Sequence, residues 1–248
     1  MQKGDKKMVW LPAPNALDIE SHQVDVWRVS LELATASVKL LGSYLSADES
    51  QRAARLHFPE DRKRFITAHG CLRDILARYL HCEPRQLTFS TGEHGKPALT
   101  SHKGINFNLA HSGDYALIAI TRGRRVGVDV ERVRQDLEME KIARRYFSKR
   151  EVSELMALPQ EDRKVAFFNC WTRKEAYIKA HGLGLSQPLD SFDVSLSPGK
   201  PTVLRATRPD LQEAARWSLE SLVIDSQYPS AVAVEGQGLE IRLWDWNL

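Results

Sequence analysis

The chain of 248 residues has little of several features that mark common protein classes. Its three cysteines, Cys71, Cys82 and Cys170, are far apart and form no CxxC pair, which excludes a disulfide framework and a cysteine-based zinc site. No apolar run is long enough to span a membrane, and the basic start lacks the hydrophobic stretch of a signal peptide. We therefore expect a cytoplasmic protein that does not bind membranes, with a mobile arm over residues 1–15.

Excess charge is also small. The 35 basic and 32 acidic side chains leave a formal charge of +3, well short of a general nucleic-acid binder. This slight basicity suits an acidic or phosphate-bearing partner, and no nucleic acid is expected. The hydrophobic content, by contrast, is ordinary: 42% of the residues are hydrophobic, which is enough at this length to bury a substantial core.

The sequence contains an internal repeat. Four short segments recur in the same order roughly 100 residues further along, which is typical of duplicated structural units. The pairs are VDVWRV at 24–29 with VDVERV at 128–133, SADE at 46–49 with SKRE at 148–151, EDRK at 60–63 and 161–164, and GKP at 95–97 and 199–201. Features present in both copies are interpreted as scaffold, and features present in one copy as candidates for function.

Local signals give each copy the same plan. SADE and SKRE each have the Ser-x-x-Glu of a capping box, so a helix should begin at both. Long helices with core-facing stripes should follow Pro59 and Pro159, the second stripe including Trp171, and buried strands are expected at ALIAI and AVAVE. The fold class predicted is α+β, with two similar halves, residues 1–122 and 123–248, related by a pseudo-twofold axis. The active site is expected in the cleft between them, and the internal duplication favours a monomer.

Two acids interrupt a valine-rich strand. Asp129 and Glu131 in GVDVERV should share one face of the strand, while Val126, Val128 and Val130 share the other. Neighbouring carboxylates raise each other's pKa unless a cation lies between them, and their oxygens suit Mg²⁺. A solvated strand face paired with arginines is the alternative. The first copy has Trp27 in place of Glu131, so Glu131 is specific to the second copy.

Two further segments carry polar groups. Trp171, Glu175 and Lys179 recur every fourth residue, which places an aromatic, an acid and a base on one helix face, although Glu175 and Lys179 could simply form an intrahelical ion pair. This helix should end near Gly182. His111 and Ser112 end the strand INFNLAHS and could present nitrogen and hydroxyl groups to an anion, or could simply close a turn.

Taken together, GKP, FNLAHS, GVDVE, RYFSKRE and WTRKEAYIKAHGLGLS resemble the ordered signature of the phosphopantetheinyl transferases. The length resembles the larger pseudo-dimeric branch, which activates peptide, polyketide and fatty acid synthases. The resemblance implies transfer of the phosphopantetheine arm of coenzyme A to a serine of an apo acyl or peptidyl carrier protein, with release of adenosine 3',5'-bisphosphate.

The resemblance also assigns roles residue by residue. It implies that Mg²⁺ is held by Asp129, Glu131 and Glu175. Catalytic contacts are implied for Glu175, Lys179 and His111, and the general base is left open between Glu175, Glu140 and a metal-bound water, because Lys141 stands where relatives often have an acid. Coenzyme contacts are implied for Arg52, Arg64, Lys96, Pro97, His111, Ser112, Asp129, Lys174 and Lys179.

Two other functions are kept as alternatives: a non-catalytic binding module of the same fold, and a metal-dependent phosphohydrolase. The acids and Lys179 argue against the first, since a module that only docks has no use for a metal cluster. The second would need water in place of serine as the acceptor. The basic segment TRGRR at 121–125 is a candidate surface for an acidic carrier protein.

Overall fold

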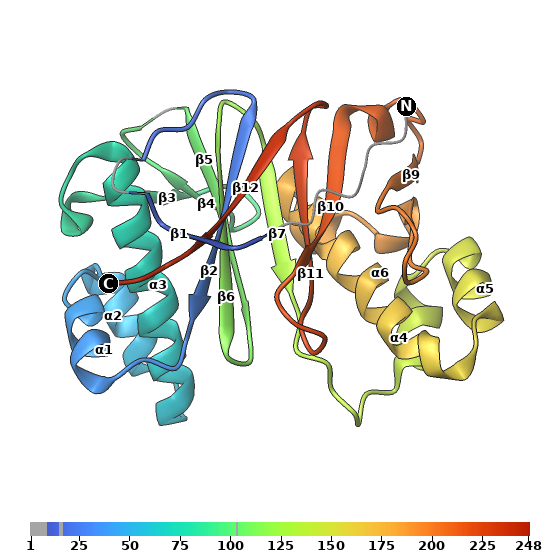
Figure 1. Ribbon diagram of the computed structural model, residues 1–248, viewed down its shortest axis with the longest axis horizontal. Coiled ribbons are helices and arrows are strands. Elements are labelled where there is room, and N and C mark those ends of the chain that lie inside the picture. Colours follow the sequence, from blue (N-terminus) through green and yellow to red (C-terminus); the bar gives the residue numbers. More distant parts are fainter. Residues whose placement is uncertain (1–8, 15–16, 103) are drawn as a thin grey trace.

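A computed structural model describes residues 9–14, 17–102 and 104–248. Most of the predicted mobile arm lies outside these residues, but Leu11–Pro12 form a short strand, β1, where no strand was expected. The described chain forms four layers in the order helix, sheet, sheet, helix (Figure 1). The mixed α+β architecture with two halves is therefore confirmed.

The first half follows the predicted order of elements. Strand β2 (Gln23–Ser30) is followed by helices α1 (Thr35–Gly42), α2 (Ala47–Ala54) and α3 (Pro59–Leu80). The strands β3 (Phe89–Thr91), β4 (Pro97–Leu99), β5 (Ile105–Ser112) and β6 (Tyr115–Arg122) complete it. Helix α2 begins at Ser46 with the expected capping box, because Ser46 and Glu49 bond each other's backbone N–H groups.

The second half repeats this order. Strand β7 (Val126–Val130) precedes helices α4 (Met139–Tyr146), α5 (Lys149–Ala157) and α6 (Gln160–His181), and the strands β8 (Phe192–Val194), β9 (Leu204–Thr207), β10 (Trp217–Val223), β11 (Pro229–Glu235) and β12 (Glu240–Asp245) follow. The second capping box, Ser148 with Glu151, is also present. Helix α6 ends at Gly182, whose φ of 81° is the predicted left-handed terminator.

Three apolar cores hold the layers together. One lies between α3 and the sheet β1-β12-β2-β6-β5, and a second lies between α6 and the sheet β10-β11-β7. The third joins the inner faces of the two sheets, and Val126, Val128 and Val130 belong to it, as the alternation of β7 predicts. The duplicated halves therefore pack sheet against sheet.

The last strand departs from the simple division at residues 122 and 123. Strand β12 pairs in parallel with β2, with Ile241 opposite Val24, and thus lies in the sheet of the first half. Figure 1 shows this strand crossing from the second half to the first. The predicted range 123–248 thus includes a strand of the first sheet, whose Ile241 and Leu243 pack into the core between the sheets. The domain boundary stays a prediction.

Candidate active site

Strand β7, which carries Asp129, and helix α6, which carries Glu175 and Lys179, make a close backbone contact. A Cβ atom at Gly127 would lie 2.2 Å from both Ala176 O and Ala180 N, so only glycine permits this approach. Asp129, two residues along the same face of the strand, then lies against the helix that carries Glu175 and Lys179. Val126 and Val128 face the other way, into the core between the sheets.

The buried carboxylate of Asp129 is only half satisfied. Its Oδ1 accepts a hydrogen bond of 2.5 Å from Lys179 Nζ, whereas its buried Oδ2 has no hydrogen-bond partner among the described residues. The side chain is 6% exposed, which makes an unpaired oxygen costly. An additional cation or donor at Oδ2 would remove this cost.

The charges of the acids and of Lys179 influence one another's pKa values. Burial raises the pKa of Asp129 to about 7, with Glu131 and Glu175 adding to the rise and Lys179 opposing it. Burial also raises the pKa of Glu175. Burial alone would lower the pKa of Lys179, but the attraction of Asp129, Glu175 and Glu131 raises it overall.

These donors have the chemistry of a magnesium site. Carboxylate oxygens are the ligands that Mg²⁺ takes, and the unpaired Oδ2 of Asp129 is an oxygen without a partner. Within the described ranges, however, no three His, Cys, Asp or Glu side chains are arranged as a ready metal site. In this arrangement the ammonium of Lys179 neutralises Asp129.

His111 and Ser112 lie at the end of β5, beside the same acids. Ser112 Oγ donates to Glu131 Oε2 at 2.9 Å and accepts from Arg132 N at 3.0 Å, so it fixes the residue that follows β7. Desolvation lowers the pKa of His111, and the charges of His69, Lys179 and Arg64 lower it further. Burial and these positive charges therefore favour the neutral form of the imidazole.

The predicted arginines belong to the first half. Arg64 Nη2 lies 3.1 Å from Asp114 Oδ1, and Asp114 also accepts a 3.0 Å hydrogen bond from Tyr228 of the second half. Arg52 Cζ lies 5.4 Å from the centre of the Phe65 ring. Sequence reasoning missed Asp114 and Tyr228, because neither belongs to a repeated segment or a charge pattern.

Lys96 and Pro97 lie on the β3–β4 hairpin. Lys96 Nζ donates to three carbonyl oxygens, at 2.8 Å to Val126, 2.7 Å to Lys179 and 3.3 Å to Ala180. Burial lowers its pKa to about 8. Pro97 is exposed and begins β4, as expected for a turn that precedes a strand.

Lys174, predicted to contact the coenzyme, is instead part of the scaffold. It is fully buried, its Nζ donates to Leu189 O and Phe192 O, both at 2.6 Å, and it lies 2.8 Å from Glu151 Oε2. The first half contains the same arrangement, because Arg73 pairs with Glu49 and donates to two loop carbonyls. The expectation for Lys174 is corrected for this reason.

The predictions for Trp171 and Glu140 have different outcomes. Trp171, predicted to be core, is only half-buried, and it lines a small pocket together with Glu131, Ile142 and Phe167. Glu140 is exposed on α4, where its Oε1 lies 3.7 Å from Arg163 Nη1. Its role as a base stays a prediction.

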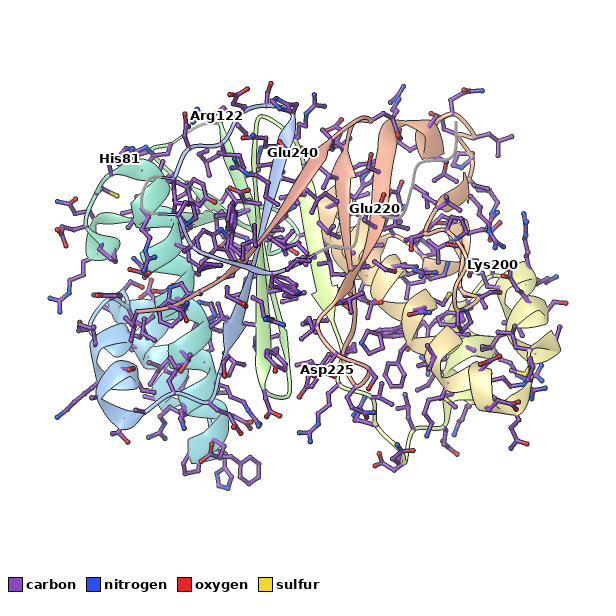
Figure 2. The ribbon with its side chains drawn as sticks, in the orientation of Figure 1. His81, Arg122, Lys200, Glu220, Asp225 and Glu240 are labelled. Carbon is purple, nitrogen blue, oxygen red and sulfur yellow. The ribbon has the colours of Figure 1, made fainter. Side chains whose placement is uncertain are left out.

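The acids lie at the end of the molecule where β7 ends and β11 begins. Ser230 is opposite Val130, and Glu131 N bonds Pro229 O at 3.0 Å. In Figure 2 the loop that carries the labelled Asp225 lies at this end, at the bottom centre of the view. Asn108 of β5 also joins the halves nearby, since its Oδ1 accepts from Val128 N at 2.8 Å.

Comparison with known proteins identifies the family. Residues 125–233 match the model of the 4'-phosphopantetheinyl transferase superfamily, and residues 32–122 match that of the 4'-phosphopantetheinyl transferase N-terminal region. The 4'-phosphopantetheinyl transferase HetI of Nostoc sp. is 40% identical over 240 residues, which is 96% of this chain and 98% of HetI. Sfp of Bacillus subtilis, also a 4'-phosphopantetheinyl transferase, is 34% identical over 62% of this chain and 67% of its own.

Among solved structures, the holo-acyl-carrier-protein synthase of Thermotoga maritima covers 45% of this chain and 62% of its own, at 24% identity and a TM-score of 0.37. The sequence relatives and family models carry the assignment, since together the two models match both halves. The chain belongs to the 4'-phosphopantetheinyl transferase superfamily.

Proposed function

We propose that this protein is an enzyme that transfers 4'-phosphopantetheine from coenzyme A to a serine hydroxyl of an apo carrier protein and releases adenosine 3',5'-bisphosphate. The observation that carries the proposal is the half-satisfied Asp129, held by Lys179 beside Glu131 and Glu175, in a chain of this family. A cluster of acids and a base with an unpaired buried oxygen suits a bound metal and a diphosphate.

Asp129, Glu131 and Glu175 would hold Mg²⁺, which when bound neutralises charge on the diphosphate. Lys179 would then be free to interact with phosphate oxygens, because the metal would replace it as the partner of Asp129. Burial and the charge of Lys179 both lower the pKa of His111, and an imidazole N–H of this residue can donate a hydrogen bond to a phosphate oxygen.

The reaction forms a bond between the serine oxygen and the β-phosphorus of coenzyme A. The bond from that phosphorus to the bridging oxygen breaks, and adenosine 3',5'-bisphosphate leaves with the electron pair. The serine proton must pass to a base, and we assign this role to Glu175, whose pKa burial raises, in preference to the exposed Glu140. In-line positioning does most of the work in such transfers.

Arg52 and Arg64 would contact the 3'-phosphate of the coenzyme, and Ser112 and Pro97 would line its pocket. Arg64 is supported by its position at the contact between the halves, where Asp114 holds its guanidinium. Arg52 is exposed, and no ion pair within the described part of the chain would have to break for it to reach a ligand. Lys174 is left out of this set because it is fully buried.

The partner would be an acidic acyl or peptidyl carrier protein, met by a monomer in the cytoplasm. None of the helices described is long and apolar enough to cross a membrane. The cysteines Cys71, Cys82 and Cys170 are free thiols, which suits a reducing compartment.

The test is intact-protein mass spectrometry of an apo carrier protein incubated with this protein, coenzyme A and Mg²⁺. We expect the mass of the carrier to rise by one phosphopantetheine group, and the gain to disappear with EDTA. No gain on several carriers together with no binding of coenzyme A would favour a non-catalytic module. Hydrolysis of coenzyme A without carrier modification would favour a phosphohydrolase.

A further inference from the structure

The ammonium of Lys96 joins the two elements that carry the candidate catalytic groups. It donates to Val126 O on β7 and to Lys179 O and Ala180 O on α6. Val126 precedes Asp129 by three residues on the same strand, and Lys179 is the residue whose side chain holds Asp129. Lys96 therefore bonds the strand and the helix at the same time.

The end of α6 needs donors of this kind. The last four carbonyl groups of a helix have no partner within it, and a cation is favourable near the C-terminal end of the helix dipole. Gly182 N satisfies Ile178 O at 2.9 Å. Lys96 supplies donors to the next two carbonyls, those of Lys179 and Ala180.

The β3–β4 hairpin packs against this end of α6. Its turn is closed by Gly92 N, which bonds Lys96 O at 2.9 Å. A Cβ at Gly182 would lie 3.6 Å from Lys96 Cδ, and one at Gly184 would lie 3.8 Å from His94 O. Both glycines have positive φ, 81° and 55°, a conformation that favours glycine. The GLG segment that follows α6 can therefore turn closely against the hairpin.

The alternative role for Lys96 is a direct contact with coenzyme phosphate. That role would require the ammonium to leave three carbonyl oxygens, two of them within 2.8 Å. A single lysine ammonium has three donors, and all three are used here. The contacts therefore favour a structural partner over an anion.

We propose that Lys96 is a positioning residue, which pins β7 to the C-terminal turn of α6 and so sets the distance between Asp129 and Lys179. The inference rests on the proposed transferase function for its effect on catalysis, but not for its effect on the fold. Without the pin, only the packing at Gly127, which reaches the backbone of Lys179 and Ala180, would hold this turn of the helix against the strand, and its position relative to Asp129 would be less fixed.

The test compares Lys96→Met, which keeps the apolar stem but removes the ammonium, with Lys96→Arg and with Lys39→Met. Lys39 is exposed on α1, so the last variant is a control for the loss of one positive charge. Three quantities are measured for each protein: kcat for transfer to a carrier protein, the Kd of coenzyme A, and amide hydrogen exchange.

For Lys96→Met we expect kcat to fall by about tenfold or more, because small misplacements of reacting groups are costly. The Kd of coenzyme A should change less than about twofold, since no coenzyme contact is lost. Exchange should become about tenfold faster in the last turn of α6 and in β7. Lys96→Arg should restore part of kcat and of the protection, and Lys39→Met should match the wild type.

A large rise in the Kd of coenzyme A with unchanged hydrogen exchange would overturn the proposal in favour of direct coenzyme binding. Unchanged kcat and unchanged exchange would overturn it as well. Hydrogen exchange needs no substrate, so a protein that lacked transferase activity but showed the expected exchange would contradict the proposed function and not the pin.

Discussion

Lys179 Nζ and Asp129 Oδ1 lie 2.5 Å apart, which makes a lysine the immediate neutralising partner of the most buried acid in the candidate site. The pair leaves Asp129 Oδ2 without a partner among the described residues. Lysine and a metal ion would thus compete for the same carboxylate. The first two predictions below concern this carboxylate: its protonation without metal, and its removal by mutation.

The stability of the metal-free protein should depend on the protonation of Asp129. Its pKa is raised from 3.8 to about 7, so the folded state binds more protons than the unfolded state between those values, and stability from this group falls as pH rises through the window. We expect Asp129→Asn to be less stable than wild type, or equal, at pH 5, and to gain on it by about 1 kcal/mol or more by pH 8.

The measurement is urea unfolding at both pH values with EDTA present. The difference between the two proteins is used because other titrating groups, such as His111 and His181, then cancel. A difference that is constant between pH 5 and pH 8 would show that Asp129 is ionised throughout.

Removing a proposed metal ligand should abolish transfer without unfolding the protein. For Asp129→Ala and Glu175→Ala we expect transfer to fall by at least about a hundredfold, because each removes charge stabilisation at the diphosphate. Carrier modification measured by mass spectrometry, with circular dichroism as a check of folding, tests this. Glu161→Ala, which removes an exposed acid from the first turn of α6, is the control. Full activity in either site variant would refute the ligand assignment.

A methyl group at Gly127 should separate β7 from α6. Gly127→Ala places a Cβ 2.2 Å from backbone atoms of Ala176 and Ala180, which cannot move aside as a side chain can. We expect a loss of about 3 kcal/mol or more in the free energy of unfolding, together with reduced activity in the folded fraction. Gly92→Ala, where the nearest atom lies at 3.5 Å, is the matched control and should cost much less.

Lys174 should matter for stability and not for coenzyme binding. Lys174→Met leaves Glu151 buried without its cation, which costs about 3 to 5 kcal/mol, and Arg73→Met should cost a similar amount through Glu49. Chemical unfolding measures the loss, and calorimetric titration of the folded protein measures coenzyme affinity. A variant of normal stability with weakened coenzyme binding would restore the site role that the sequence suggested.

Signals that act within a few residues predicted the local structure well. The capping boxes at Ser46 and Ser148, the glycine that ends α6 and the valine alternation of β7 are all present, because each depends on hydrogen bonds or side-chain periodicity over one or two turns. The burial of Asp193 in β8 depends instead on a non-local contact, because its partner Arg208 lies outside the local pattern.

The assignment of Lys174 failed for a physical reason. Its counterpart in the first half is Arg73, so a comparison of letters does not show that the two cations make the same buried pair with a capping-box glutamate. The contacts of Lys96 were equally invisible, because they join a hairpin to a strand and a helix that lie far apart in the sequence. Non-local contacts of this kind depend on how the halves pack.

The parallel pairing of β12 with β2 constrains the order in which the first sheet can form during synthesis. Strand β2 leaves the ribosome before the second half, but one of its two neighbours, Glu240–Asp245, is synthesised after strands β7 to β11. Until then β2 has an open edge, with Val24 and Val26 lacking part of their final cover. The first half therefore cannot finish folding as an independent unit, because its sheet closes only after residues 240–245 have been synthesised.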